Sequence, residues 1–455
     1  MTLPEQGRIH FIGIGGAGMS AIAKVLIERG HEISGTDMRE SRATAALSGM
    51  GAQVAIGHDS TLVDGAAAIV YSSAVKKSNP ELVAARRAGV VVLHRGEALA
   101  SLLSSNRSIV VAGTHGKTTT SSMILSILKS AGLDPTYVIG GALQGVPINA
   151  GNGEDDVAVA ESDESDGSFL LLDPSIAVIT NIEPDHLDHW GTLEALEEAF
   201  QAFIGTADCV VVGHDDKVAR LTADRSEVRL VTYGDGGDIS AGEVSLYAYS
   251  TTFVLLSPKT RLPVHLNLPG HHNLLNALAA VAACLSLGVG IEAVGVGLES
   301  FTGVERRYQM RGEKRNITVI DDYAHHPTEI AATLSAARLG PWRRVIAVFQ
   351  PHLYSRTRAL RAEFGAAFSE ADVVVVTDVY AAREEPVPGV TGKTVSDAVC
   401  MCFFGRPVAY VPARKELLGY LAAQARPGDL VLTLGAGDIT TLADELLEAL
   451  DVEAA

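Results

Sequence analysis

A glycine-rich turn in the first third of the chain carries residues that could bind a nucleoside triphosphate. Residues 113–119, Gly-Thr-His-Gly-Lys-Thr-Thr, follow an apolar run and open a helical pattern. In loops of this kind backbone amides cradle phosphate, the lysine reaches the β- and γ-phosphates, and the next hydroxyl binds magnesium. We expect these roles for Lys117 and Thr118, and we call residues 113–119 the phosphate loop. The spacing departs from the usual pattern at Val111, where a glycine is typical.

An earlier glycine turn has the spacing of a diphosphate-binding fingerprint. It contains Gly13, Gly15, Gly16 and Gly18, and Asp37 stands at the end of the next expected strand. Glycines allow the backbone to approach a diphosphate, and the acid can accept ribose hydroxyls. A nicotinamide dinucleotide and a nucleotide sugar both have that chemistry, and a tight turn without a ligand is the structural alternative.

Carboxylates and histidines follow two further expected strands. One cluster is residues 161–166, Glu-Ser-Asp-Glu-Ser-Asp, and the other is residues 185–189, Asp-His-Leu-Asp-His. Because the carboxyl ends of parallel strands meet at one edge of a sheet, both clusters are expected beside the phosphate loop. They therefore predict a magnesium site. A solvated acidic surface is the structural alternative.

The elements that must position these residues belong to the α/β class. Short β-branched runs without alternation predict parallel strands covered by helices on both faces, and they recur along the chain at 9–14, 68–71, 108–112, 157–160, 176–180, 209–212, 317–320, 345–349, 373–377 and 430–434. Residues 228–268 alternate instead and predict an antiparallel patch. Joints are expected near 101–106 and 302–304.

Composition and charge argue against several classes of protein. The 455 residues predict two to four domains, and the net charge of -18 falls mostly in residues 106–304, which argues against non-specific nucleic-acid binding. Four cysteines suit a reducing compartment, and neither an export signal nor a membrane anchor is expected.

Seven motifs together resemble the Mur ligase family. They are Gly113–Thr120, Glu161–Asp166, Asn181–Asp188, Gly270–Asn276, Glu305–Tyr308, Asp321–Pro327, and Gln350–His352 with Ser355–Thr357. The resemblance implies three domains: a Rossmann-like UDP-sugar-binding domain (1–105), a central P-loop-type ATP- and magnesium-binding domain with a mostly parallel sheet (106–304), and a Rossmann-like domain (305–455) that closes over the site and contributes to amino-acid binding.

The histidine in the phosphate loop and the segment Asp321–Pro327 resemble most the branch that adds L-alanine to UDP-N-acetylmuramate. The resemblance therefore implies a cytoplasmic ATP- and magnesium-dependent ligase of peptidoglycan synthesis, which works through an acyl phosphate and serves cell shape and division. A recycling ligase that adds a cell-wall tripeptide is the nearest alternative. A nicotinamide oxidoreductase and a nucleotide switch or UDP-sugar sensor are alternatives of other classes, and a monomer–dimer equilibrium stays open.

The resemblance also implies roles for individual residues. For catalysis these are Lys117, Glu161, His186, Arg307, His326 and Arg356. For ATP they are Gly113, Thr114, His115, Gly116, Lys117, Thr118, Thr119, Asn273, Asn276 and Asp322. For UDP-N-acetylmuramate and L-alanine they are Gly13, Gly15, Gly16, Gly18, Asp37, Ser72, Ser73, His325, His352 and Arg356. Two magnesium ions are implied, with Thr118, Glu161 and His186 as ligands.

Two positions depart from the family's pattern. Leu353 stands where the alanine-adding branch often has a basic residue, which leaves Arg356 and Arg358 as the candidates for that contact. Several branches carry a carbamoylated lysine shortly after the histidine that corresponds to His186, yet no lysine occurs between Lys129 and Lys217. We therefore expect a carboxylate to replace it, from among Asp188, Glu194, Glu197 and Glu198.

Overall fold

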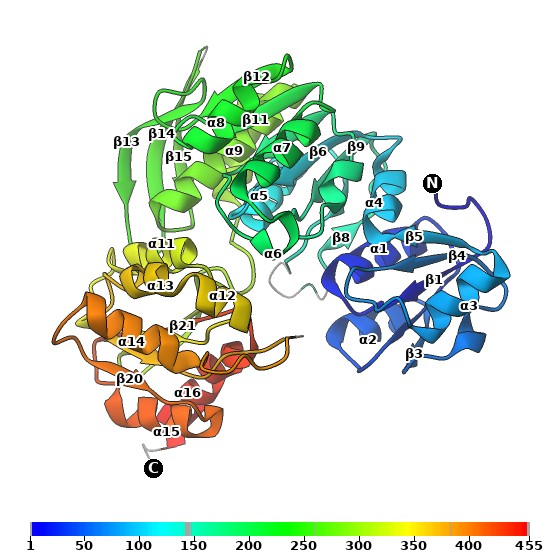
Figure 1. Cartoon of the computed structure of the whole chain (residues 1–455). Helices are drawn as coiled ribbons and strands as arrows, with labels where there is room; N and C mark the ends of the chain where they lie inside the picture. Colours follow the sequence, from blue (N-terminus) through cyan, green and yellow to red (C-terminus); the bar gives the residue numbers. More distant parts are fainter. Residues whose placement is uncertain (1, 142–145, 147, 259, 383, 453–455) are drawn as a thin grey trace. The chain divides into compact units, whose positions relative to one another are not determined.

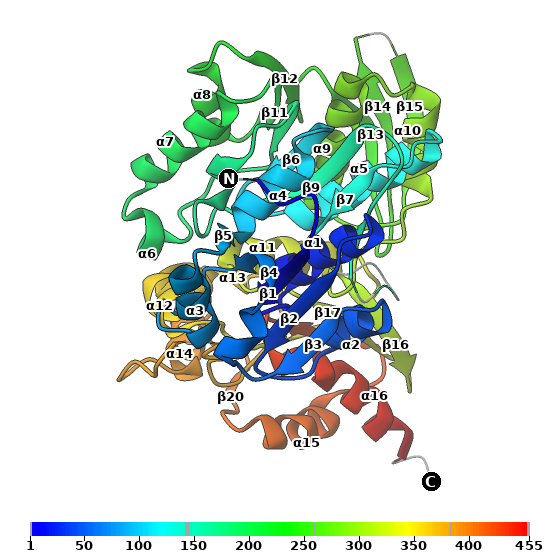
Figure 2. The ribbon, with the colours of Figure 1, turned by 90° about the vertical axis from the view of Figure 1, so that its right-hand side faces the viewer.

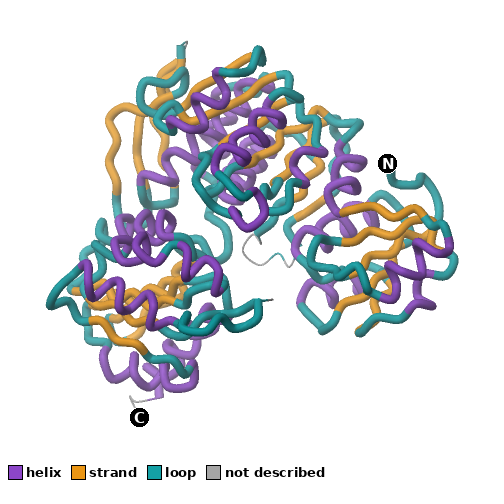
Figure 3. Tube along the Cα trace, viewed as in Figure 1, coloured by secondary structure: helices purple, strands orange, loops and turns teal. Residues whose placement is uncertain are grey.

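The computed structural model describes residues 2–141, 146, 148–258, 260–382 and 384–452. These residues form two compact units. One contains residues 1–244, 252–267 and 273–304, and the other contains residues 245–251, 268–272 and 305–455. In both units helices cover sheets of strands (Figure 3). The α/β class predicted from the apolar runs is therefore confirmed.

The first unit begins with a parallel sheet of five strands in the order β3-β2-β1-β4-β5 (Figures 1 and 2). Its strands are β1 (Arg8–Ile12), β2 (Ile33–Asp37), β3 (Gln53–Ile56), β4 (Ala66–Tyr71) and β5 (Val91–His94). Its helices are α1 (Ala17–Glu28), α2 (Arg42–Gly49), η1 (Ser60–Val63), α3 (Pro80–Ala88) and α4 (Arg95–Leu103). Phe11 packs in the core that holds α1, and Ile12 packs with α3, because successive strand side chains face opposite ways.

The second sheet has seven strands in the order β12-β11-β10-β6-β9-β7-β8, and the pairings of β12 through β7 are parallel. The strands are β6 (Arg107–Ala112), β7 (Thr136–Val138), β8 (Ala150–Gly151), β9 (Val157–Glu161), β10 (Ile176–Ile179), β11 (Cys209–Gly213) and β12 (Arg229–Tyr233). The helices are α5 (Lys117–Ser130), η2 (Ser168–Leu171), α6 (Leu187–Trp190), α7 (Leu193–Ile204), α8 (Lys217–Asp224), α9 (His271–Leu287) and α10 (Ile291–Glu299). Strand β6 lies between β9 and β10, so the segments that follow these three strands emerge side by side.

A three-stranded sheet follows, made of β13 (Ser240–Leu246), β14 (Thr251–Ser257) and β15 (Thr260–Leu266). Connections this short can join only antiparallel neighbours. The Tyr247 amide donates to the Ser250 carbonyl at 2.9 Å and closes the first turn. The antiparallel patch predicted for residues 228–268 is therefore confirmed for β13 to β15, whereas β12 belongs to the parallel sheet.

The sheet of the second unit has six strands in the order β16-β17-β21-β18-β19-β20, and only β16 runs antiparallel to its neighbour. The strands are β16 (Gln309–Lys314), β17 (Ile317–Asp322), β18 (Arg344–Phe349), β19 (Val373–Val376), β20 (Val408–Tyr410) and β21 (Asp429–Leu434). The helices are α11 (Pro327–Ala337), α12 (Tyr354–Ala359), α13 (Arg361–Ala367), α14 (Gly392–Cys402), α15 (Arg414–Gln424), η3 (Asp438–Thr440) and α16 (Thr441–Val452). Separate apolar cores fill its two faces.

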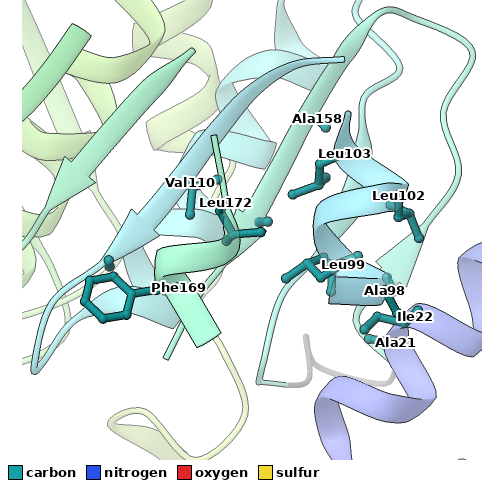
Figure 4. Close-up of a cluster of buried hydrophobic side chains, with 14 of the residues drawn as sticks. Ala21, Ile22, Ala98, Leu99, Leu102, Leu103, Val110, Ala158, Phe169 and Leu172 are labelled. Atoms are coloured by element: carbon teal, nitrogen blue, oxygen red, sulfur yellow. The ribbon is translucent and has the colours of Figure 1, made fainter. Parts of the chain in front are cut away.

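The first two sheets share one apolar core, shown in Figure 4. Side chains of α1 and α4 meet others from β6, β9 and η2 in that core. Phe169 of η2 is fully buried, and its ring lies 5.1 Å from that of Phe200, 5.2 Å from that of Phe203 and 6.2 Å from that of Trp190. No helix among the described residues is long and apolar enough to cross a membrane.

Replacing Phe169 with alanine should destabilise this shared core. Truncating a buried phenylalanine costs about 3–5 kcal/mol of unfolding free energy, because it removes burial and leaves a cavity. We expect the urea midpoint of the first unfolding transition to fall. The matched control is Leu170→Ala, whose side chain is 39% exposed and should change stability by about 0.5 kcal/mol or less. Equal midpoints for both variants would contradict this account of the core.

Candidate active site

The second glycine turn joins β6 to α5 through residues whose conformation requires glycine. Gly113 and Gly116 have φ angles of 126° and 82°. A Cβ at Gly116 would stand 2.4 Å from Oδ1 of Asn276, and one at Gly113 would stand 2.3 Å from Oγ1 of Thr180. Neither site has room for a side chain, so the turn remains tight against its neighbours.

The end of β10 holds this turn through side chains. Asn181 accepts from the His115 amide at 2.8 Å and donates to the His115 carbonyl at 3.0 Å. Thr180 donates to the same carbonyl at 2.6 Å, and Thr114 accepts from the Glu183 amide at 2.9 Å. The loop is therefore preorganised before any ligand binds.

Lys117 is bound by the acidic run, by which we mean residues Glu161–Asp166. Its ammonium donates to Glu164 at 2.9 Å and to the carbonyl of Thr114 at 3.2 Å, and it lies 4.0 Å from Asp163. Burial alone would lower the pKa of Lys117, but the charges of Glu164 and Asp163 outweigh it and raise that pKa. Burial raises the pKa of Glu164, although the charge of Lys117 opposes this shift. The lysine is thus held as a cation at the phosphate loop.

Carboxylates and a histidine gather around the loop in two groups. In the first, Thr118 donates to both carboxylate oxygens of Glu161, at 3.0 and 2.9 Å, and the amide of Gly140 donates to Glu161 at 2.9 Å. In the second, ligand atoms of Asp163, Glu164 and His186 lie within 4.8 Å of one another. Hard oxygen donors with one imidazole suit a divalent cation, so the residues present fit the predicted metal.

The two groups divide the predicted ligands between them. Thr118 and Glu161 are in contact, while His186 stands with two carboxylates that the prediction did not assign to the metal. Burial would raise the pKa of Asp163, but Lys117 and His186 lower it. Asp163 and Glu164 belong to a motif that the sequence did single out, so the motif was the available signal.

The carboxylates expected to replace the modified lysine lie elsewhere. Glu197 is 3.7 Å from Arg225, and Glu194 and Glu198 are exposed on α7. The structure does not describe the side chain of Asp188. Asp163 and Glu164 gather with His186 instead, and Oδ2 of its chain neighbour Asp185 lies 3.7 Å from Nε2 of His186.

Helix α9 brings two of the predicted nucleotide-binding residues to the second turn. Asn276 donates to Asn273 at 3.3 Å and accepts from Thr120 at 3.3 Å. Thr119 is buried at the start of α5. The asparagines therefore stand against the phosphate loop, although they are far from it in the sequence.

The first glycine turn is braced by the acid predicted for it. Asp37 accepts from the amide of Gly15 at 2.9 Å and from that of Met38 at 2.8 Å. Gly13 has a φ of 81°, and Gly16 directly precedes α1. A Cβ at Gly18 would stand 3.2 Å from the guanidinium of Arg95, a residue that no motif had indicated.

Arg95 belongs to a polar cluster around the last residue of the acidic run. Asp166 accepts from Arg95 at 3.1 Å and also from the Ser73 hydroxyl, which lies 3.0 Å from Nε2 of His94. Burial would raise the pKa of Asp166, but hydrogen bonds from Ser168 and Ser73 and the charge of Arg95 lower it to about 2. Of the two predicted serines, Ser73 is thus placed in this cluster, while Ser72 precedes it at the end of β4.

In the second unit, Asp322 closes the end of β17. It accepts from the amides of Tyr308 and Ala324, each at 2.7 Å, and burial raises its pKa to about 6. Arg307 lies 3.6 Å from Glu329, the residue that forms a capping box with His326 at the start of α11. His326 therefore has a structural role as an N-cap in addition to its predicted one.

The other predicted residues of this unit lie close together. The ring of His325 is 5.8 Å from that of His352 and 3.2 Å from Glu329. Burial lowers the pKa of His325 to about 3, although Glu329 opposes the shift and the buried Arg356 adds to it. Leu353 has a φ of 70° and donates its amide to the Tyr380 carbonyl at 3.0 Å, so its backbone helps to shape this group.

Known proteins share this sequence and fold along the whole chain. The descriptions "Mur ligase family, catalytic domain", "Mur ligase middle domain" and "Mur ligase, glutamate ligase domain" match residues 8–107, 111–284 and 306–437. UDP-N-acetylmuramate–L-alanine ligases from Renibacterium salmoninarum and Thermobifida fusca are 46% and 47% identical, over 99% of this chain and 97% and 98% of theirs.

A solved structure agrees with these relatives. The UDP-N-acetylmuramate–alanine ligase of Thermotoga maritima has a TM-score of 0.82 and 31% identity, and the match covers 98% of this chain and 100% of that one. Matches of this extent take in nearly the whole chain. The chain therefore belongs to the Mur ligase family.

Proposed function

We propose that this protein joins L-alanine to UDP-N-acetylmuramate with the hydrolysis of ATP to ADP and phosphate, in peptidoglycan precursor synthesis. The observation that carries the proposal is the buried ammonium of Lys117 at a tight glycine loop, surrounded by the carboxylates of the acidic run. The two relatives at 46% and 47% identity are both named for this reaction.

We assign the binding of each substrate to one of the three regions that contain the large sheets. Residues 1–105 bind the UDP-sugar, residues 106–304 bind ATP, and residues 305–455 close over the site and help to bind the amino acid. The braced first turn and the arginine above it support the first assignment, because a diphosphate needs amide donors and a positive charge.

In the proposed reaction a carboxylate oxygen of the muramic acid attacks the γ-phosphorus of ATP, and ADP leaves. The amine of L-alanine then attacks the acyl carbon, loses a proton and displaces phosphate. Lys117 stabilises charge on the transferring phosphoryl group, while the amides of Gly113–Gly116 cradle the phosphates. Asn273 and Asn276 hold the nucleoside, with Asp322 on its ribose.

Divalent cations fit the two groups of carboxylates beside the loop. Thr118 and Glu161 would hold one magnesium ion, and His186 with Asp163 and Glu164 would hold a second. When bound, the ions would neutralise charge on the phosphates. Asp163 and Glu164 are proposed here in place of the acids first considered on α7, because their ligand atoms lie within 4.8 Å of that of His186.

The amino acid is assigned to the group formed by His325, His352 and Arg356. A guanidinium binds a carboxylate bidentately, so Arg356 suits the carboxylate of L-alanine. The low pKa of His325 keeps its ring neutral at pH 7. A neutral ring avoids repelling the ammonium form of the amino acid. Arg307 and His326 are assigned to the acyl phosphate, and we place the enzyme in the cytoplasm, where its proposed substrates are made.

The recycling ligase is the alternative that shares most of this chemistry. A murein peptide ligase from Psychrobacter arcticus has the same fold, with a TM-score of 0.71 at 23% identity. The relatives above 40% identity favour L-alanine instead. Comparing L-alanine with the cell-wall tripeptide as the acceptor separates the two, and a preference for the tripeptide would overturn the proposal.

Substituting Lys117 with alanine should abolish ADP formation and leave the fold intact. The residue acts on charge that develops in the transition state, and one such donor is worth on the order of 3 kcal/mol, or about a hundredfold in rate. Lys129→Ala, at the exposed end of the same helix, is the matched control and should keep wild-type turnover. Turnover of the Lys117 variant within about tenfold of wild type would exclude the proposed role.

The protein should bind UDP-N-acetylmuramate and show no use for NAD. The first turn suits a diphosphate, and both ligands contain one. Calorimetric titration of the whole chain with each ligand therefore shows which of the two it binds. We expect heat of binding and a raised unfolding temperature with the UDP-sugar alone. Stronger thermal protection by NAD would favour the oxidoreductase alternative.

Activity should not depend on carbon dioxide. The chain has no lysine between Lys129 and Lys217 that could form a carbamate after His186, and carboxylates stand beside that histidine instead. Rates measured after rigorous removal of bicarbonate should equal those with bicarbonate added. A rate restored by bicarbonate, or an intact mass with one added carbon dioxide, would show that the expectation is wrong.

A further inference from the structure

The acidic run contacts the phosphate loop directly and reaches the first glycine turn through Arg95. We propose that Asp166 is a positioning residue that holds Arg95 over the first turn and thereby couples binding there to the state of the phosphate loop. The inference rests on the proposed function, because it takes the first turn as the diphosphate site and the second as the ATP site.

One end of the run is attached to the phosphate loop. The hydroxyl of Thr118 donates to the two oxygens of Glu161 in one bifurcated hydrogen bond, and Glu164 accepts from Lys117 at 2.9 Å. A bound triphosphate would compete with Glu164 for the Lys117 ammonium, because both are anions that need the same donor. Binding of a triphosphate to the loop must therefore change the interaction of Glu164 with Lys117.

The other end of the run reaches the first turn through Arg95. Nη2 of Arg95 donates to Asp166 at 3.1 Å, while Nη1 points to the turn and would lie 3.2 Å from a Cβ on Gly18. Asp166 thus orients one side of the guanidinium and leaves the other over the start of α1, where a diphosphate would lie. Ser73 bonds to the same carboxylate and to His94.

Packing limits how these residues can move. His94 caps α4 by accepting from the amide of Gly96 at 3.2 Å, and a Cβ on Gly96 would stand 2.7 Å from Cβ of Ser168. Helix α4 is also embedded in the core shared by the first two sheets (Figure 4). Arg95 is therefore presented on a rigid base, and the flexible part of its placement is the guanidinium that Asp166 holds.

A single residue, Ser165, separates Glu164 from Asp166. A rearrangement of Glu164 when ATP binds must therefore reach Asp166 and the guanidinium it orients. Each ligand fixes the same short run, so the second ligand to bind meets a run that is already ordered. Binding of either ligand should tighten binding of the other by the same factor, as linkage requires.

Calorimetry of the whole chain tests this coupling. The affinity for UDP-N-acetylmuramate is measured with and without a saturating non-hydrolysable ATP analogue and magnesium. In the wild type the analogue should tighten the sugar nucleotide about fivefold or more, the low end of typical couplings. In Asp166→Asn the ratio should fall to within about twofold of one, with the affinity for the analogue nearly unchanged.

Asp156→Asn is the matched control. Asp156 also pairs with an arginine, accepting from Arg107 at 3.2 Å through both oxygens, but at the exposed start of β6 and away from both turns. The Asp156→Asn variant should keep the wild-type ratio of sugar-nucleotide affinities with and without the analogue. Arg95→Lys should lose the coupling as Asp166→Asn does, and unfolding temperatures confirm that each variant is folded.

The outcomes separate the inference from the proposed function. A wild type that does not bind the UDP-sugar overturns the proposed function and this inference with it. A wild type that binds both ligands without coupling overturns the inference alone. The inference is also overturned if folded Asp166→Asn keeps the wild-type ratio of affinities. It is overturned as well if Asp156→Asn loses as much of that ratio as Asp166→Asn does.

Discussion

The interaction on which the site depends is the ion pair of Lys117 with the acidic run. A lysine side chain that is only 13% exposed would be costly to keep charged unless anions surrounded it, and Glu164 and Asp163 provide them. The pair can form only because β6 and β9 are parallel neighbours, which places the ends of both strands at one edge of the sheet. The strand order is therefore the structural basis of the proposed phosphate site.

The same edge gathers several of the acidic residues of the middle domain, among them Glu161, Asp163 and Glu164. Carboxylates packed beside a buried cation hold it charged, and they also form the two groups that fit divalent cations. A triphosphate brings negative charge to the lysine, and cations bring positive charge to the carboxylates. Without ligands, Lys117 offsets only part of the negative charge of these carboxylates.

Much of this could be predicted from the sequence, since the signals were local. The β-branched runs indicated parallel strands, and the two glycine turns stand where positive φ angles at Gly13, Gly113 and Gly116 require them. The contacts of Arg95 could not be predicted, because it lies in no motif and meets Gly18 and Asp166 only through the packing of α4. Asp163 and Glu164 lay within a recognised motif, but only the folded run shows that they face Lys117 and His186.

The central claim is that phosphate passes from ATP to the carboxylate of the sugar before the amide bond forms. The most direct test is a complete reaction with UDP-N-acetylmuramate labelled with oxygen-18 in both oxygens of the muramic carboxylate. The account predicts one labelled oxygen in the inorganic phosphate released and one retained in the new amide. Inorganic phosphate without the label would contradict an acyl phosphate and with it the role given to Lys117.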